Sequence, residues 1–242
     1  FYLYPLDKSF DADGKDLNAT PNGSFYTFTS RLGLDVTGPD IGKARSSAKI
    51  ETDFGGFSGS NTMLRIRQAY VNLDWGKSAV LVGITWHPLF GAVMPDVLNL
   101  STGAPFQPFN RSPQIRYQYK ANSRVQLMAS VLWQLQYLSS GPKGMSEDYI
   151  KNSCIPEMFV GADFTPADGW LMGLGAHMIS LKPRTSTEWK EQTFKVNERM
   201  TAFSYEAHLK YSGRNYTFAA KTLMASALDL SLIHISEPTR PY

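Results

Sequence analysis

The sequence predicts an all-β fold of antiparallel strands that run up and down in turn, and three observations predict it. Apolar and polar side chains alternate along about ten segments, as they do on the two faces of a β-strand. The connections between these segments are long and short in strict alternation. One segment, residues 43–54, carries an almost wholly ionic face.

The predicted strands share this alternation and are mostly close to the length of about 9–11 residues that crosses a membrane in a tilted strand. They span residues 24–36, 43–54, 63–75, 79–87, 114–120, 124–137, 156–165, 170–181, 200–211 and 216–224. Residues 1–5 are expected to be the end of one further strand.

Among the early strands, the segment 43–54 separates its two faces most clearly. Its odd positions are Lys43, Arg45, Ser47, Lys49, Glu51 and Asp53, and its even positions are small, apolar or Thr. The preceding segment 24–36 puts Leu32, Leu34 and Val36 on one face. The Gly/Pro-containing residues 38–42 between them predict a short turn.

The third strand changes phase within its length. Leu64 and Ile66 begin the apolar face, but Ala69 and Val71 continue it one position out of step. A single inserted residue explains the shift, so the sequence predicts a β-bulge near Arg67–Gln68.

The later strands alternate as well. Residues 124–137 are expected to be the longest regular strand, and residues 166–169 and 212–215 are expected to be hairpin turns. The long connection 88–112 is too apolar for an ordinary exposed loop, since it contains Leu89, Phe90 and Phe109 among others. This connection either folds into the space that the sheet encloses and narrows that space, or packs on its neighbours at the rim.

Together these features predict a transmembrane β-barrel, antiparallel and up-and-down, of which this chain would hold an incomplete set of about ten to eleven strands. Such barrels have lipid outside, water inside, short turns at one end and long loops at the other. Neither of the two stretches poor in charge, at 78–95 and 125–141, is a continuous apolar span of about 20 residues, so we reject membrane helices there. A soluble sandwich has no reason to alternate its loop lengths.

The composition excludes several other classes. The net charge of +3 is too small to indicate a nucleic-acid partner. The single cysteine, Cys154, excludes an internal disulfide framework and a Cys-rich metal site. Aromatic residues make up 13% of the chain, which suits the aromatic girdles of membrane barrels.

The inner face is expected to carry the charges that line a pore. The candidate pore-lining residues are Arg31, Lys43, Arg45, Lys49, Glu51, Asp53, Arg65, Arg67, Arg116, Lys120 and Arg124. Many of the basic ones fall on neighbouring strands and would attract anions. The alternative is that these charges only keep a water-filled lumen wet.

No catalytic or cofactor site is expected, so we predict that the protein is not an enzyme and holds no metal. Ser204 and His208 share a face, but their spacing along one strand does not support a hydrolase. The inner-face histidines, His177 and His208, are expected to be polar residues in contact with water. Residues 11–16 resemble part of a calcium loop but lack its later Glu, so a plain Asp/Gly turn is expected there.

Both ends of the chain have unusual features. Residues 230–240 resemble the translation of a sequencing adapter. We therefore expect residues 1–229 to be a partial outer-membrane β-barrel and residues 230–242 to be an artefactual tail. The chain begins at Phe1 without a signal peptide, so a missing natural N-terminus is also expected.

Three segments carry a resemblance to a known family. Residues 63–75 (MLRIRQAYVNLDW), 83–90 (GITWHPLF) and 114–118 (QIRYQ) resemble the porin-like outer-membrane proteins of Bacteroidetes-type bacteria. The resemblance implies a closed barrel with a polar lumen, passive transport and no cofactor. The matching pore-side positions are Arg65, Arg67 and Arg116.

The function expected from these features is that of an outer-membrane porin of a Gram-negative bacterium, which lets small polar solutes diffuse passively and is weakly anion-preferring. The expected partners are the lipid bilayer and those solutes; a homo-oligomer is left open. The alternative is an outer-membrane barrel whose long loops bind or adhere. A soluble β-rich carbohydrate-binding domain is a third, weaker hypothesis.

Overall fold

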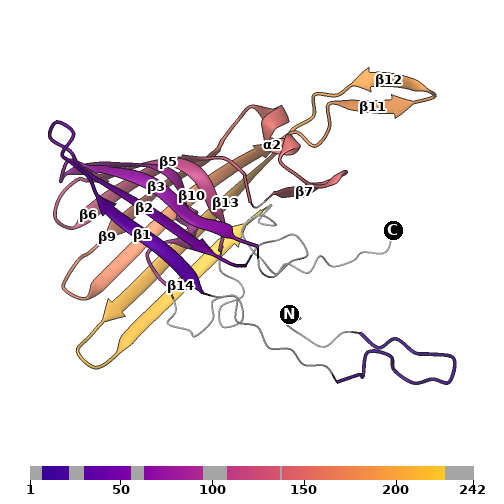
Figure 1. Ribbon diagram of the computed structural model, residues 1–242, viewed down its shortest axis with the longest axis horizontal. Helices are drawn as coiled ribbons and strands as arrows, with labels where there is room; N and C mark the ends of the chain where they lie inside the picture. The colour runs from indigo at the N-terminus through magenta and orange to yellow at the C-terminus, as the bar shows by residue number, and fades with distance from the viewer. Residues whose placement is uncertain (1–6, 22–29, 56–62, 95–107, 137, 227–242) are drawn as a thin grey trace.

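In the computed structural model, which describes residues 7–21, 30–55, 63–94, 108–136 and 138–226, ten strands form one antiparallel sheet (Figure 1). The strands are β1 (Arg31–Thr37), β2 (Arg45–Asp53), β3 (Arg65–Asp74), β4 (Ser78–Trp86), β5 (Arg111–Lys120), β6 (Val125–Leu132), β9 (Glu157–Phe164), β10 (Trp170–Leu181), β13 (Met200–Ser212) and β14 (Thr217–Ala225).

The ten strands pair in the order of the sequence. Each long strand pairs with the one before it and the one after it, from β1 to β14, with no crossover. The predicted up-and-down all-β fold is therefore confirmed. Within the described ranges no pairing joins β14 to β1, so the sheet is open, consistent with an incomplete barrel.

Small elements fill the long connections, and the sequence did not predict them. They are η1 (Pro88–Phe90), the hairpin of β7 (Ser139–Gly141) and β8 (Gly144–Ser146), α2 (Asp148–Ser153), and the hairpin of β11 (Ser186–Trp189) and β12 (Gln192–Lys195). Figure 1 shows that α2, β7 and the β11–β12 hairpin gather at one end of the sheet, and the hairpin projects beyond it. No helix in the described ranges is both long enough and apolar enough to cross a membrane.

The predicted β-bulge is confirmed. Glu51 on β2 pairs with Gln68 on β3, whereas the next residue, Thr52, pairs with Ile66. Arg67 is thus the extra residue. The bulge allows Arg67 and Gln68 both to interact with residues of the inner face, as their contacts show: Arg67 bonds Glu51, and Gln68 bonds Thr85.

Some predicted strand bounds are wrong. The strand expected at 43–54 begins only at Arg45, because Lys43 lies in the turn between Ile41 and Ala44. The strand expected at 124–137 ends at Leu132. There Trp133 donates a last backbone hydrogen bond to Pro113, and the Gln134 side chain then bonds Ser139 and Glu157.

The two faces of the sheet differ in polarity. Large apolar side chains alternate along the outer face and are exposed; they include Leu34, Val71, Val82, Ile115, Val160, Leu174 and Phe203. The inner face buries polar side chains instead, including Gln114, Ser130, Glu157, His177, Ser204, Glu206 and His208. A large exposed apolar face of this kind is typical of a surface that meets another apolar phase.

Two small apolar clusters are buried on the described part of the chain. One joins Tyr149 and Ile150 of α2 to Ile179, Leu181 and Ala202 near the ends of β10 and β13. The other packs Leu89 of η1 against Leu132 and Phe159 on the inner face, with Met128 and Leu223 beside them. The second cluster fixes η1 inside the curve of the sheet.

Candidate functional site

The segment η1 lies against the inner face of the sheet. It follows β4 directly, with Pro88 in its first turn, where the fixed φ of proline suits a helix start. Lys221 of the edge strand β14 donates hydrogen bonds to the carbonyl oxygens of Leu89 (2.7 Å) and Phe90 (2.6 Å). Residues 88–90 therefore fold against the inner face, whereas residues 95–107 of the same connection lie outside the described ranges and leave the two alternatives for it untested.

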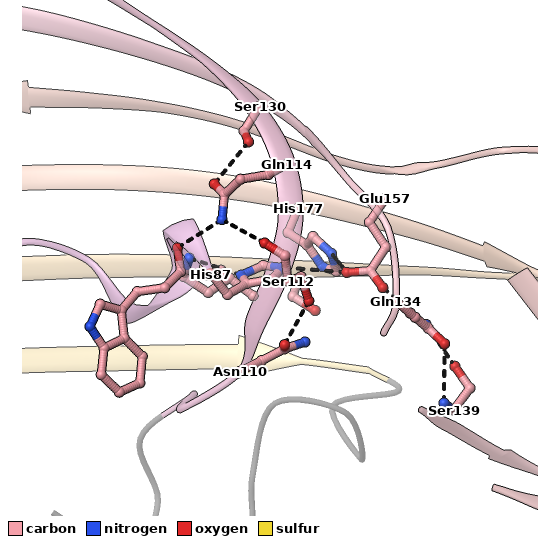
Figure 2. A network of polar contacts seen from close by, with 12 residues as sticks. His87, Asn110, Ser112, Gln114, Ser130, Gln134, Ser139, Glu157 and His177 are labelled. Atoms are coloured by element: carbon pink, nitrogen blue, oxygen red, sulfur yellow. Dashed lines mark hydrogen bonds and ion pairs between the residues drawn. The ribbon is translucent and has the colours of Figure 1, made fainter. Parts of the chain in front are cut away.

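A buried cluster of two histidines and one carboxylate anchors the start of η1. Glu157 Oε2 lies 3.4 Å from His87 Nε2 and 3.4 Å from His177 Nε2. All three residues are at most 4% exposed. Figure 2 shows both imidazoles directed at the Glu157 carboxylate, with His87 coming from the segment after β4, His177 from β10 and Glu157 from the start of β9.

Neighbouring groups orient this His87–Glu157–His177 cluster. Gln134 Nε2 donates to Glu157 Oε1 (3.0 Å), and Ser139 holds the Gln134 amide in turn (Figure 2). The backbone N–H of Leu89 donates to His87 Nδ1 (3.1 Å), so the His87 side chain also caps η1. Burial lowers the pKa of His87, which lies in the connection after β4, and so favours its neutral form.

A second histidine cluster lies on strands β9 and β13. His208 Nδ1 lies 3.1 Å from Glu206 Oε2, and His208 Nε2 lies 3.3 Å from Asp163 Oδ1. Since β10 runs between β9 and β13, His208 must reach across that strand. It can do so because the β10 residue beneath it is Gly173, where a Cβ atom would lie 2.2 Å from the imidazole.

A cavity of about 490 Å³ opens beside η1. Its polar walls come from Arg116, Gln118 and Gln126 on one side and from Asp163, Glu206 and His208 on another; His87, Trp86, Phe90, Met128 and Phe159 also contribute. The volume lies in the range that holds small organic solutes. Mixed polar and apolar walls allow contacts with both parts of such a solute.

Arg116 is held in this wall without an acidic partner in the described ranges. Its Nε and Nη2 donate to Gln114 Oε1 (3.0 and 2.7 Å), and Nη2 also donates to the Trp86 carbonyl (2.6 Å). Gln114 Nε2 itself donates to three carbonyl oxygens, those of Thr85, Trp86 and Ser112. The guanidinium therefore keeps its full charge next to the cavity.

Two other inner-face cations, Arg65 and Arg67, are neutralised by neighbouring carboxylates. Asp53 accepts hydrogen bonds from Arg65 Nε (2.9 Å), Arg65 Nη2 (2.7 Å) and Arg67 Nη1 (2.7 Å), while Glu51 accepts from Arg67 Nε (2.6 Å). The Arg67 guanidinium also lies 5.8 Å from the Trp86 ring centroid. This four-residue ionic network joins β2 to β3 at the bulge.

The candidate pore-lining residues fall into four groups. Glu51, Asp53, Arg65 and Arg67 meet in the network, whereas Arg116 lies at the cavity. Lys49 pairs with Asp35, and Arg45 pairs with Asp74, both in exposed positions. Arg31 and Lys120 are exposed at strand ends, and Lys43 and Arg124 are exposed in turns. Their role in a pore stays a prediction.

Sequence reasoning missed the histidine clusters and was wrong about their surroundings. His177 and His208 were expected to be wetted, but they are buried against carboxylates. Each lies at an inner position of its strand, which alternation predicts; their partners are distant in sequence, and only the strand order brings them together. The calcium-like segment is a plain turn, since Asp11 Oδ1 accepts from the backbone of Asp13 and Lys15.

Among known proteins, the matches to this chain come from solved structures. No family model matches the chain, and no curated protein matches it. Its fold is similar to that of the outer-membrane channel DcaP of Acinetobacter baumannii, with a TM-score of 0.68 and 21% identity over 87% of this chain and 56% of that one. It is also similar to a loop L8 deletion mutant of OmpT, an outer-membrane protein of Vibrio cholerae, with a TM-score of 0.50 and 15% identity.

The OmpT likeness covers 82% of this chain and 61% of that one, so the chain spans little more than half the length of either structure. At these identities the likeness concerns the fold. The chain has the fold of outer-membrane β-barrel proteins.

Proposed function

We propose that this chain, which has the fold of outer-membrane β-barrels, forms part of the wall of an outer-membrane channel through which small polar solutes diffuse passively. The observation that carries the proposal is the division of one up-and-down sheet into an exposed apolar outer face and a polar inner face. Lipid requires the first, and a water-filled lumen requires the second.

The constriction at η1 is the part of this wall that would select solutes. Charged, amide and aromatic side chains line the cavity beside η1. Diffusion past such walls needs no bound cofactor and no covalent step. Solutes would therefore be sorted by size and charge at this point.

A weak anion preference follows from how the inner charges are paired. Four of the nine basic candidate residues are matched by carboxylates, namely Arg45, Lys49, Arg65 and Arg67. Arg116 has no such partner in the described part of the chain, and it lies at the cavity. The opposite wall holds carboxylates of its own, so the preference is expected to be modest.

Conductance in planar lipid bilayers tests the proposal. The folded protein should give discrete current steps, and the reversal potential across a KCl gradient should indicate slight selectivity for chloride. Arg116→Gln should remove the chloride preference, whereas Arg184→Gln, at an exposed ion pair with Glu198 beyond the end of β10, should leave it unchanged. Absence of current steps from correctly folded protein would overturn the channel, and an unchanged reversal potential in Arg116→Gln would overturn the anion site.

A second candidate function is binding or adhesion by the long loops, with a blocked lumen. The observation in its favour is the β11–β12 hairpin, which projects beyond the sheet and exposes Trp189 and Phe194 (Figure 1). Under this alternative the protein gives no current steps, and removal of the hairpin abolishes attachment of cells or ligands while the sheet still folds.

Several expectations from the sequence remain parts of this proposal. The three motifs favour a source among Bacteroidetes-type bacteria, and the outer-membrane bilayer and small polar solutes are the proposed partners. A homo-oligomer stays open. The assignment of residues 230–242 as an artefactual tail stays a prediction, since residues 227–242 are outside the described ranges.

A further inference from the structure

We propose that His87, Glu157 and His177 bind a divalent transition-metal ion, with Zn²⁺ the best-suited ion, and thereby fasten the start of η1 to strands β9 and β10. One ligand atom from each residue lies within 4.8 Å of the other two. This site requires the fold alone and does not depend on the proposed channel activity.

The spacing of the ligand atoms also fits a bound ion, although His177 Nε2 and Glu157 Oε2 form a long hydrogen bond without one. Glu157 Oε2 is 3.4 Å from each His Nε2. Hydrogen bonds between charged partners are shorter, about 2.7–2.9 Å. Ligands at the Zn–N and Zn–O distances of about 2.0–2.2 Å in a tetrahedron lie about 3.3–3.6 Å apart. The separation between the His and Glu atoms thus leaves the room that such an ion takes.

Unsatisfied polar atoms point to the same conclusion. Among the described residues, His87 Nε2 and His177 Nδ1 are buried and make no contact with hydrogen-bond geometry, although His87 Nε2 lies 3.4 Å from Glu157 Oε2. Leaving a buried nitrogen without a partner costs about 1–3 kcal/mol. A metal ion between His87 and His177 would satisfy the first of these atoms directly.

The surroundings of the cluster are those of a supported metal site. Gln134 donates to the Glu157 oxygen that faces away from the histidines, and so fixes the carboxylate plane. His87 also lines the cavity, so the cluster lies directly beside it. Two imidazoles and one carboxylate suit Zn²⁺ and similar first-row ions, whereas Ca²⁺ and Mg²⁺ prefer oxygen ligands.

One contact opposes the ion and sets a limit on its affinity. The Leu89 N–H donates to His87 Nδ1, which puts the proton of the neutral imidazole on Nε2. An ion at Nε2 would move that proton to Nδ1 and remove the acceptor for Leu89. Ion binding and the cap of η1 therefore compete, and binding should alter the backbone at Leu89.

Metal binding by the folded protein in detergent tests this assignment. Equilibrium dialysis against ZnCl₂ should give one bound Zn²⁺ per chain, and Co²⁺ should give the intense visible absorption of a tetrahedral site. Glu157→Gln and His177→Gln should each weaken binding at least tenfold. His208→Gln is the matched control, because it removes a buried histidine that also contacts carboxylates outside this cluster, and it should bind as the wild type does.

A measurement on the wild type covers the case in which the variants do not fold. X-ray absorption of the Zn²⁺-loaded protein should reveal two imidazole ligands. Failure of the folded wild type to bind Zn²⁺, or a spectrum with one imidazole or none, would overturn the proposal. Equal binding by folded Glu157→Gln and wild type would overturn it as well.

Discussion

Single residues decide which groups meet on the inner face. Gly173 is an example, because its missing side chain lets His208 of β13 reach Asp163 of β9 across the intervening strand. Asp53 is another, because it accepts hydrogen bonds from two arginines on the neighbouring strand. Both cases concern buried or half-buried polar groups, for which small changes have large effects.

The substitution Gly173→Ala should destabilise the fold. The added Cβ would lie 2.2 Å from His208 Cε1 and 2.6 Å from Asp163 Oδ1, so the pair must separate. We expect a loss of about 1–3 kcal/mol in the free energy of unfolding, measured by urea titration of the folded protein in detergent. Gly33→Ala is the control, because its nearest neighbouring atom is 3.7 Å away. Equal unfolding midpoints for the two variants would contradict the packing described.

The substitution Asp53→Asn should be more costly. It leaves the buried Arg67 guanidinium with Glu51 as its one remaining carboxylate in the network. Breaking a buried ion pair by removing one partner costs about 3–5 kcal/mol. Asp74→Asn, whose partner Arg45 is exposed, should change the unfolding midpoint little. Urea titration distinguishes Asp53→Asn from Asp74→Asn. Similar unfolding midpoints for the two variants would argue against a stabilising network.

At the scale of elements, the sequence predicted the long strands well and the small elements not at all. Alternation identifies a strand by itself, so all ten long strands were expected, and the phase change located the bulge at Arg67. Strand ends were less accurate, since Gln134 leaves the pattern to bond Glu157. The elements η1, α2 and the two small hairpins depend on contacts distant in sequence, which no local pattern contains.

The position of η1 should depend on Lys221. Its ammonium group bonds the carbonyl oxygens of Leu89 and Phe90, and each hydrogen bond to a charged group contributes about 1.5–3 kcal/mol. In Lys221→Met, amide hydrogen exchange in residues 87–94 should accelerate about tenfold or more, because local opening becomes easier.

Lys210→Met provides the comparison for this experiment. Lys210 lies on β13 and its pairing partner is Ala219 on β14, but no hydrogen bond joins its ammonium group to η1 among the described contacts. Exchange in residues 87–94 should stay at the wild-type rate. If Lys221→Met also left the exchange rate of residues 87–94 unchanged, Lys221 would not hold η1 in place.

At the scale of the whole molecule, the fold class could be predicted because a sheet with one apolar and one polar face requires alternating apolar and polar residues in every strand. The contacts of η1 and the histidine clusters could not be predicted in the same way. They combine residues from the segment after β4 and from β9, β10, β13 and β14, and only the completed sheet brings these together. The predicted pore-lining residues, chosen by charge, include surface ion pairs as well as buried ones.

The central claim is that the outer face meets lipid while the inner face meets water. Labelling of single cysteines in membranes with a charged, membrane-impermeant maleimide tests it most directly, in a Cys154→Ser background because Cys154 is exposed. Two nearby positions on β5 differ in face: Ile115 is an exposed outer residue, and Gln118 lines the cavity. We predict that Gln118→Cys reacts and Ile115→Cys is protected until the lipid is removed. Rapid labelling of Ile115→Cys in intact membranes would contradict the account.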